Sequence, residues 1–200
     1  RSTRKESSAA SDVYKRQGSG NATVDNGTLN LDLAASNVGG NLTVTSGALA
    51  GITDSGTVTV GGNFSATTDA NSGVINMGTM AVDGSFTLAP NSTGAVTIVN
   101  DAGLNLAAST MGGTFSGTAT TGNITDSGAL AITGTTTLVT SADDATITLD
   151  TTTNAFTGAL TITTNDSSGT DADVTIDGGT TALIIAASTI DGDLTLTSGN

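Results

Sequence analysis

Apolar residues alternate with threonine in short runs along most of this chain. The runs lie at residues 57–60, 85–88, 95–98, 145–149, 159–163 and 193–197. A period of two places the aliphatic side chains on one face of a strand and threonine on the other, and both kinds of residue favour strands. Gly, Asn, Asp and Ser interrupt the runs every 8–12 residues and supply turns. No apolar stripe has the 3.6-residue period of a helix, so the sequence predicts an all-β fold.

The strand patterns belong to a longer repeat. Residues 31–45, 104–118 and 183–197 match one another in six of fifteen columns, and each contains the string Ala-Ala-Ser. Columns that are apolar in one copy stay apolar in the others. The copies start at positions 31, 104 and 183, so their spacing is similar but not constant. Repetition at this length is typical of stacked repeat architectures.

Two further landmarks keep their place in the repeat. The string Ile-Thr-Asp-Ser-Gly occupies 52–56 and 124–128, and a Thr-aliphatic pair precedes each Ala-Ala-Ser by ten or eleven residues. We interpret Ile-Thr-Asp-Ser-Gly as a corner, in which the Asp accepts backbone N–H bonds and the Gly takes a positive φ. A third copy of this string would begin near position 203, so we expect the repeat region to continue past Asn200.

Two all-β architectures compete for this pattern. β-Sandwich modules need about 100 residues each, long loops and a bulky core. Here the loops are short, and the core candidates are small aliphatic residues with four phenylalanines, Phe64, Phe86, Phe115 and Phe156. A right-handed parallel β-helix fits better, because each coil needs only short strands, tight corners and stacked aliphatic side chains. We expect roughly nine coils of about 20 residues, with about four coils in each long repeat.

Charge divides the chain into two unlike parts. All five Lys and Arg residues lie within the first 16 positions, whereas 18–200 contains sixteen Asp and no Lys, Arg, His, Glu, Cys, Trp or Tyr. The long part therefore offers no imidazole, thiol or amine for catalysis or soft-metal binding, and no cation to neutralise nucleic acid or an anionic membrane. We expect no enzyme activity, no cofactor, no nucleic-acid partner and no membrane insertion.

The basic segment 1–17 differs from everything after it. Its string 12–17, Asp-Val-Tyr-Lys-Arg-Gln, resembles the translation of a transposon-end adapter used in sequencing libraries. A genuine basic arm is the alternative. In both cases the segment has too few apolar residues to pack, and we expect it to be disordered or a frayed helix. The fold is therefore assigned to residues 18–200.

Three strings carry a family resemblance. Residues 104–113, 122–134 and 147–160 resemble repeats of filamentous-haemagglutinin-like bacterial adhesins, and the resemblance covers about 20–200. It implies a β-helical stalk segment of a large secreted or surface-exposed adhesin, exported by two-partner secretion through an outer-membrane transporter. The implied partners are the rest of the same polypeptide and a host or neighbouring-cell surface. The family's export and binding domains are not represented, so the resemblance supplies no functional residue.

Acidic clusters are the first alternative to a purely structural role. They comprise Asp143 and Asp144; Asp171, Asp173 and Asp177; and Asp191 and Asp193. Calcium needs several convergent oxygens, and neither an EF-hand glutamate nor a Gly-Gly-x-Gly-x-Asp repeat is present. We therefore expect solvated corner residues and assign no catalytic, cofactor or metal site. An extracellular binding module for glycan or calcium remains the second interpretation, and a polysaccharide-active enzyme with paired Asp the third.

Threonine and asparagine supply two weaker signals. Thr-x-Thr pairs such as 57/59 and 118/120, and the triplet 135–137, could order water and bind ice, but their irregular spacing favours outward β-branched filler. The Asn-x-Ser/Thr triplets are candidate glycan acceptors. They begin at Asn21, Asn26, Asn41, Asn63, Asn91, Asn123 and Asn165.

Overall fold

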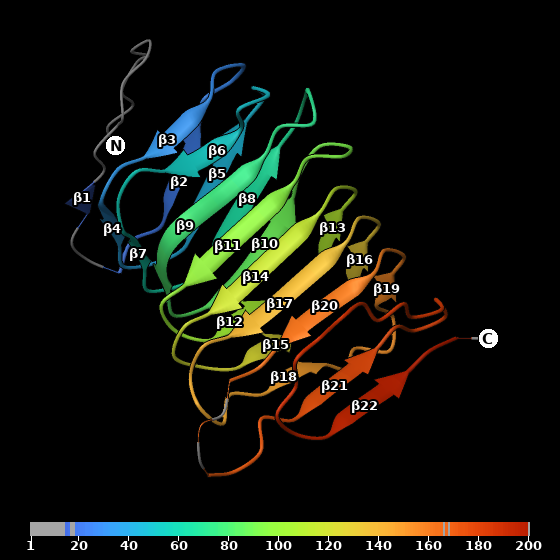
Figure 1. The fold of residues 1–200 in the computed structure, drawn as a ribbon. Helices are drawn as coiled ribbons and strands as arrows, with labels where there is room; N and C mark the ends of the chain where they lie inside the picture. Colours follow the sequence, from blue (N-terminus) through green and yellow to red (C-terminus); the bar gives the residue numbers. More distant parts are fainter. Residues whose placement is uncertain (1–14, 17–18, 166, 168, 200) are drawn as a thin grey trace.

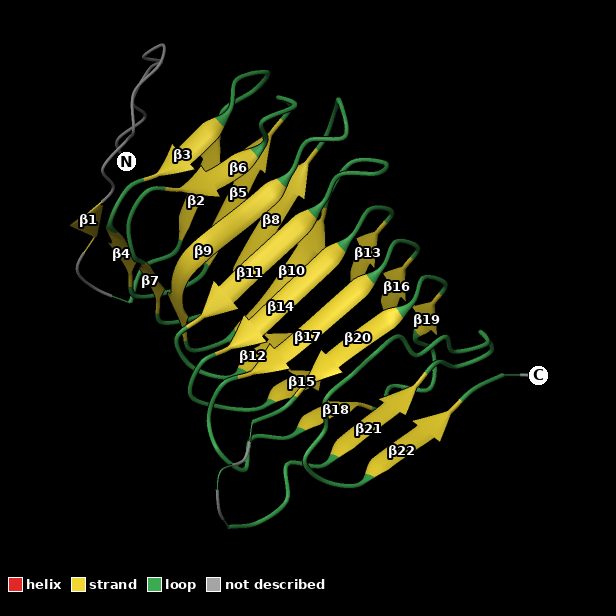
Figure 2. Ribbon diagram, viewed as in Figure 1, coloured by secondary structure: helices red, strands yellow, loops and turns green. Residues whose placement is uncertain are grey.

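The protein is described by a computed structural model over residues 15–16, 19–165, 167 and 169–199. Within these ranges every regular element is a strand, and every strand pairs with its neighbours in parallel (Figures 1 and 2). The strands stack from one end of the molecule to the other, with residues 15–16 at one end and residues 194–197 at the other. The predicted all-β, parallel solenoid is confirmed. No helix long and apolar enough to cross a membrane occurs in the described part of the chain.

The described strands form three parallel sheets of nine, ten and three strands. The nine-strand sheet contains β2 (Ala22–Asp25), β5 (Leu42–Ser46), β8 (Phe64–Thr68), β10 (Ser85–Ala89), β12 (Leu104–Leu106), β15 (Ile124–Asp126), β18 (Ile147–Leu149), β21 (Val174–Asp177) and β22 (Leu194–Thr197). The ten-strand sheet contains β1 (Lys15–Arg16), β3 (Leu31–Leu33), β4 (Ser36–Val38), β6 (Ile52–Asp54), β7 (Val58–Val60), β9 (Ile75–Val82), β11 (Val96–Asn100), β14 (Phe115–Ala119), β17 (Thr136–Thr140) and β20 (Leu160–Thr163). The three-strand sheet contains β13 (Ser109–Met111), β16 (Leu130–Ile132) and β19 (Ala155–Phe156).

Each turn of the solenoid crosses the nine-strand sheet once. Its nine strands therefore mark about eight turns, close to the roughly nine coils expected. The turns differ in length: a short one runs from Phe64 to Phe86 and a longer one from Ile147 to Val174, and the connections between strands absorb the difference. With parallel strands about 4.8 Å apart, eight turns make a rod of about 38 Å.

The core is a set of columns that run along the rod. Leu42, Phe64 and Phe86 occupy one register position in three successive turns, and each is buried. The rings of Phe64 and Phe86 meet edge to face, with centroids 5.8 Å apart. Phe115 and Phe156 are also buried, so all four phenylalanines are in the core, as predicted. Burial of one aliphatic or aromatic side chain contributes about 1.5–3 kcal/mol, and this contribution recurs in every turn.

The long sequence repeat spans three and a half turns, not the four expected. The Thr-aliphatic landmark falls in β2 of the nine-strand sheet in the first copy, in β11 of the ten-strand sheet in the second, and in β21 of the nine-strand sheet in the third. From β2 to β10 the chain makes three turns, and β11 follows on the opposite sheet. Successive copies therefore present the same sequence on opposite faces of the rod.

The basic segment predicted to be disordered or helical is described only in part. Lys15 and Arg16 form the short strand β1, which pairs in parallel with Asn37 and Val38 of β4. The other residues of 1–17 lie outside the described ranges. These two residues thus extend the ten-strand sheet by one strand at its N-terminal end.

Candidate functional site

The Ala-Ala-Ser string is a kink, which lies between two short strands in the first two copies and between two isolated β-bridges in the third. In each copy the serine hydroxyl donates to the carbonyl two residues earlier: Ser36 to Ala34 at 2.7 Å, Ser109 to Ala107 at 2.8 Å and Ser188 to Ala186 at 3.0 Å. The Ser109 and Ser188 hydroxyls also accept from a backbone N–H of the preceding turn. Serine suits this position because its small hydroxyl closes the kink and, in the second and third copies, also satisfies a donor of the preceding turn. The most regular motif of the repeat therefore has a structural role.

The corner interpretation of Ile-Thr-Asp-Ser-Gly is half right. The Asp54 carboxylate accepts from the backbone N–H groups of Gly78 and Thr79, each at 2.7 Å. Asp126 accepts in the same way from Asp150 and Thr151 of the next turn. These bonds confirm the predicted role of the Asp, whose carboxylate holds two successive turns together.

The predicted positive φ of the Gly in this string is wrong. Neither Gly56 nor Gly128 is among the residues with positive φ. A Cβ on Gly56 would instead lie 2.8 Å from the backbone nitrogen of Ala35, and one on Gly128 would lie 2.5 Å from that of Ala108. The glycine is needed because the corner lies directly against the Ala-Ala-Ser kink of the preceding turn. The two repeated strings are thus one packing unit.

Asparagines form a ladder at the corner that precedes the nine-strand sheet. The side-chain oxygen of Asn21 accepts from the N–H of Asn41, Asn41 accepts from the N–H of Asn63, and Asn63 accepts from the N–H of Ser85, at 2.9–3.0 Å. Further along, Asn123 accepts from Thr146 and Asp173 from Asp193. Each bond satisfies a corner N–H that the sheet leaves open.

This ladder explains the Asn-x-Ser/Thr triplets at four of their seven positions. After a ladder Asn the next residue points into the core and the one after it points outward, where Ser or Thr is suited to a solvated strand face. Asn21, Asn41, Asn63 and Asn123 all stand at this corner. The three positions of the triplet therefore have three structural roles: a hydrogen-bonding Asn at the corner, an apolar residue in the core, and Ser or Thr on the outer face. These roles account for the triplet without glycan attachment.

Sequence reasoning missed the polar side chains that point inward at strand ends. Asn100 is fully buried; its amide exchanges hydrogen bonds with the backbone N–H and C=O of Val82 and donates to the carbonyl of Gly103 at 2.7 Å. Thr68 donates to Gly73 and accepts from Asn91. Each stands where an alternating pattern predicts an apolar residue. In the sequence, such residues could have been found as polar residues at inward positions of a strand pattern, directly before a turn.

Members of the acidic clusters in the C-terminal part accept hydrogen bonds from their own turn or from the next one. Asp143 accepts from the side chains of Asn165 and Ser167, and Asp177 accepts from the N–H of Gly179 at 2.7 Å. Asp173 is a rung of the corner ladder. In the described residues no group of three or more Asp, Glu, His or Cys side chains could hold a metal ion.

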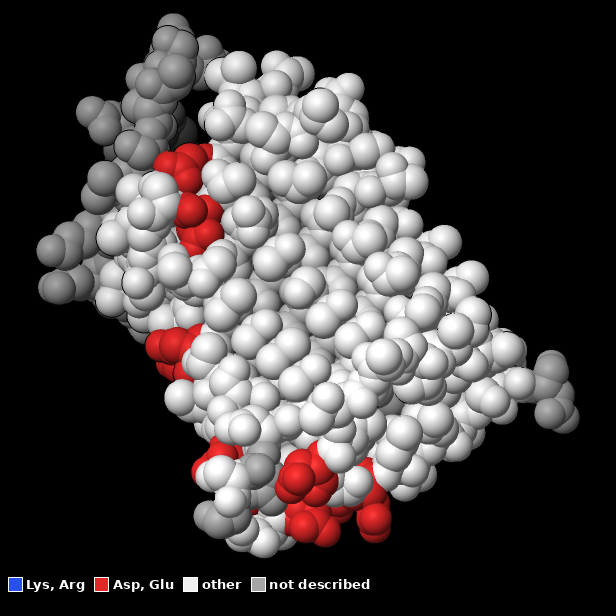
Figure 3. Space-filling model, viewed as in Figure 1, with Lys and Arg blue, Asp and Glu red and all other residues white. Residues whose placement is uncertain are grey.

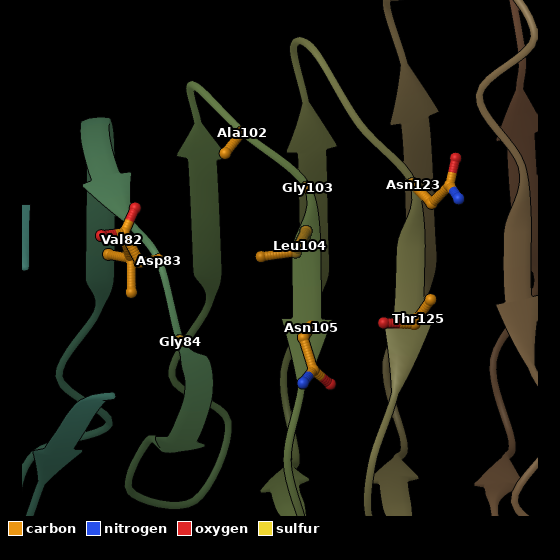
Figure 4. Close-up of a pocket in the computed structure, with 9 residues that line it drawn as sticks. All are labelled: Val82, Asp83, Gly84, Ala102, Gly103, Leu104, Asn105, Asn123 and Thr125. Atoms are coloured by element: carbon orange, nitrogen blue, oxygen red, sulfur yellow. The ribbon is translucent and has the colours of Figure 1, made fainter. Parts of the chain in front are cut away.

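A surface hollow of about 250 Å³ lies where the corner ladder is interrupted (Figure 4). Ser85 pairs with Asn105, but Asn123 lies opposite Gly103, so the ladder shifts by two positions between these turns. Gly84 and Gly103 are among its lining residues, and the buried Oδ1 of Asn105 has no hydrogen-bond partner in the described residues. Asp83 is the one charged residue among those that line it. The remaining lining residues are neutral, and none is aromatic.

The outer face of the ten-strand sheet carries two aligned columns. The first is Thr97, Ser116, Thr137 and Thr161; the second is Val99, Thr118, Val139 and Thr163. We call these eight side chains the Ser/Thr array. Its rows are unevenly spaced in sequence, yet the strands bring them into register. The irregular spacing was therefore an incorrect reason to dismiss an ordered threonine face.

This combination of stacked parallel sheets, stacked core columns and repeated corners defines a β-solenoid repeat protein. A family model described as "Repeats of unknown function (DUF5649)" matches residues 19–77 and 93–163. The chain belongs to this family. Each matched segment contains one Ala-Ala-Ser kink and one Ile-Thr-Asp-Ser-Gly corner. Comparisons with curated proteins and with solved structures gave no match.

Proposed function

We propose that this chain is a structural stalk segment of a large secreted or surface-exposed bacterial adhesin, that it holds distal binding domains away from the cell, and that it is not an enzyme. One observation carries the proposal: the recurring polar motifs make hydrogen bonds between successive turns of the solenoid. The kink serine, the corner aspartate and the ladder asparagine all bond to the turn before or after their own. A chain whose repeated chemistry serves only to join turns is suited to a stiff spacer.

Charge supports the same proposal. The described part of 18–200 contains acidic side chains and no cation, so parallel stalks repel one another and stay soluble. The carboxylates lie mainly along the edges of the face in Figure 3. Resemblance to filamentous-haemagglutinin-like repeats adds the export route and the outer-membrane transporter. The proposed location is therefore outside the cell, with the remainder of the same polypeptide as partner.

Antibodies against the 200-residue chain test this proposal on cells that carry the gene. We expect them to label intact cells, and immunogold particles to lie along a shaft instead of at its tip. In-frame deletion of residues 19–199 should shorten the shaft by about 40 Å and leave adhesion in place. Labelling that requires permeabilised cells would overturn the location, and loss of adhesion from a shaft that is still exported would overturn the spacer role.

Calcium separates the stalk from a metal-dependent binding module. The melting temperature of the full chain should be the same in calcium and in a chelator, because no described group of carboxylates converges on one point. An increase of several degrees in calcium would instead support the binding module.

A further inference from the structure

The Ser/Thr array combines an in-register set of hydroxyl side chains with the absence of charge. Its eight positions come from four adjacent strands, and six of the eight are Thr or Ser. All eight are partly exposed, while the residues between them in each strand point into the core. In Figure 3 the middle of this face is free of carboxylates.

Register gives the array a fixed two-dimensional spacing. Neighbouring strands are about 4.8 Å apart, and alternate residues along a strand are about 6.7 Å apart. The hydroxyls and methyls of the array therefore form a regular lattice with these two repeats. Rows of oxygen atoms on the prism faces of ice repeat at intervals close to both values.

We propose that the Ser/Thr array binds the surface of ice. The hydroxyls hold first-layer water by hydrogen bonds, and the methyl groups of Thr and Val order the water between the columns. Because that layer already has nearly the spacing of the crystal, it merges with the growing lattice. The absence of carboxylates from the array matters because a charged group pressed against ice would lose hydration that the neutral lattice does not replace.

Two comparisons favour ice over a polysaccharide as the occupant. Glycan surfaces are usually held by aromatic stacking, but the four phenylalanines are buried in the core and the described residues contain no Trp or Tyr. The equivalent face of the first repeat copy, on β2, β5, β8 and β10, carries Asp25 and Ala89 in its second column. The face of the first copy therefore has a carboxylate in its second column, whereas both columns of the second copy are neutral.

The experiment is ice-affinity partition of the fluorescently labelled full chain, in which ice grows slowly on a cooled probe and the protein in the ice is compared with that in the liquid. We expect the chain to enter the ice, and Thr118→Lys, at the centre of the array, to reduce the retained fraction at least fivefold. Thr137→Lys, one row away, should act similarly. The matched control is Thr110→Lys, an exposed outward position on β13 of the three-strand sheet, which should stay within twofold of the unaltered chain.

Circular dichroism must show that all three variants retain strand structure. Exclusion of the unaltered chain from ice would overturn the proposal, as would an equal loss in Thr110→Lys and Thr118→Lys. Sedimentation with crystalline cellulose and chitin tests whether the array binds a polysaccharide. Binding to these solids without retention in ice would overturn the proposal and assign the array to a glycan. The proposal does not depend on the stalk function, and failure of either leaves the other intact.

Discussion

The two halves of the solenoid are built from the same repeat but distribute their strands in opposite ways. In the N-terminal half the nine-strand sheet has the long strands β5, β8 and β10, while the ten-strand sheet is divided into short pieces such as β3 and β4. In the C-terminal half β14 and β17 of the ten-strand sheet are long, and the opposite side is divided into β12 and β13, then β15 and β16. The kink has moved from one face to the other.

The kink changes face because the sequence repeat does not span a whole number of turns. Because one copy spans three and a half turns, its Ala-Ala-Ser kink falls on alternate faces, and a long-stranded face in one copy continues as a kinked face in the next. The strand β9 makes the transition, since its first part pairs with β6 and its second part with β7. A chain made of similar copies thus yields a rod whose long-stranded faces alternate.

The largest expected effect comes from one core position compared across the three copies. Leu42, Phe115 and Leu194 occupy the same repeat column, but their exposed fractions are 3%, 1% and 42%. Substitution by Ala should lower the free energy of unfolding by about 4 kcal/mol at Phe115, about 3 kcal/mol at Leu42 and less than about 1 kcal/mol at Leu194, since the cost follows the buried volume removed. Urea unfolding with comparison of m-values measures this order.

Equal losses in the free energy of unfolding at the three positions would show that burial does not determine how much each side chain of this column contributes to stability. A control is Leu49→Ala in the exposed turn after β5, where 67% exposure predicts a change within about 0.5 kcal/mol.

The kink serines give the second comparison. Ser109→Ala removes the acceptor for the buried N–H of Leu88 as well as the bond to Ala107, and should cost about 1–3 kcal/mol. Ser36 donates the same bond, to Ala34, but no backbone N–H of the described residues donates to its hydroxyl, so Ser36→Ala should cost about 1 kcal/mol or less. Hydrogen exchange at the Leu88 amide reports on the difference. A Leu88 amide that stays as protected in Ser109→Ala as in the unaltered chain would contradict it.

Much of the fold could be predicted from local patterns. Alternation placed strands at 85–88 and 159–163 within about one residue of β10 and β20, because inward aliphatic and outward Thr residues are required in every turn. The half-turn alternation could not be predicted, since the sequence shows the spacing of copies but not how much of the chain each corner consumes. Turns as unequal as Ala22 to Leu42 and Ile147 to Val174 make that count ambiguous.

The candidate surface was hidden for the same reason. Its unevenly spaced rows become one array only when the register is known, because the extra residues lie in loops outside the sheet. Likewise Asn100 and Thr136 violate the apolar pattern, and only the structure shows that they are buried at the ends of strands. The Oγ1 of Thr136 has no hydrogen-bond partner in the described residues, and the structure offers no physical reason for it.

Substitutions at the corner glycines test why glycine is needed there. We expect the reason to be the close approach of the preceding turn, and not the backbone conformation of the glycine. Gly128→Ala should destabilise the protein by about 1–3 kcal/mol and Gly56→Ala by somewhat less, because the new Cβ would lie 2.5 Å and 2.8 Å from a backbone nitrogen of the preceding turn. Gly78→Ala is the matched control: its nearest neighbour would be 3.9 Å away and its φ is not positive. Thermal melting compares the three variants. If Gly78→Ala destabilises as much as Gly128→Ala, the corner contact is not the cause.

The smallest expected effect concerns the asparagine ladder. Here the continuous part of the ladder around Asn41 is compared with the single hydrogen bond of Asn123. Asn41 accepts from Asn63 and donates its own N–H to Asn21, whereas Asn123 stands where the ladder restarts. Both corners are exposed, so a lost acceptor is partly replaced by water, and Asn41→Ala and Asn123→Ala should each cost about 0.5–1 kcal/mol. If rungs reinforce one another, the double variant Asn41→Ala/Asn63→Ala will cost less than the sum of its single changes, while Asn41→Ala/Asn123→Ala will be additive. Urea unfolding of both cycles decides this, and additivity in both would mean that the rungs act independently.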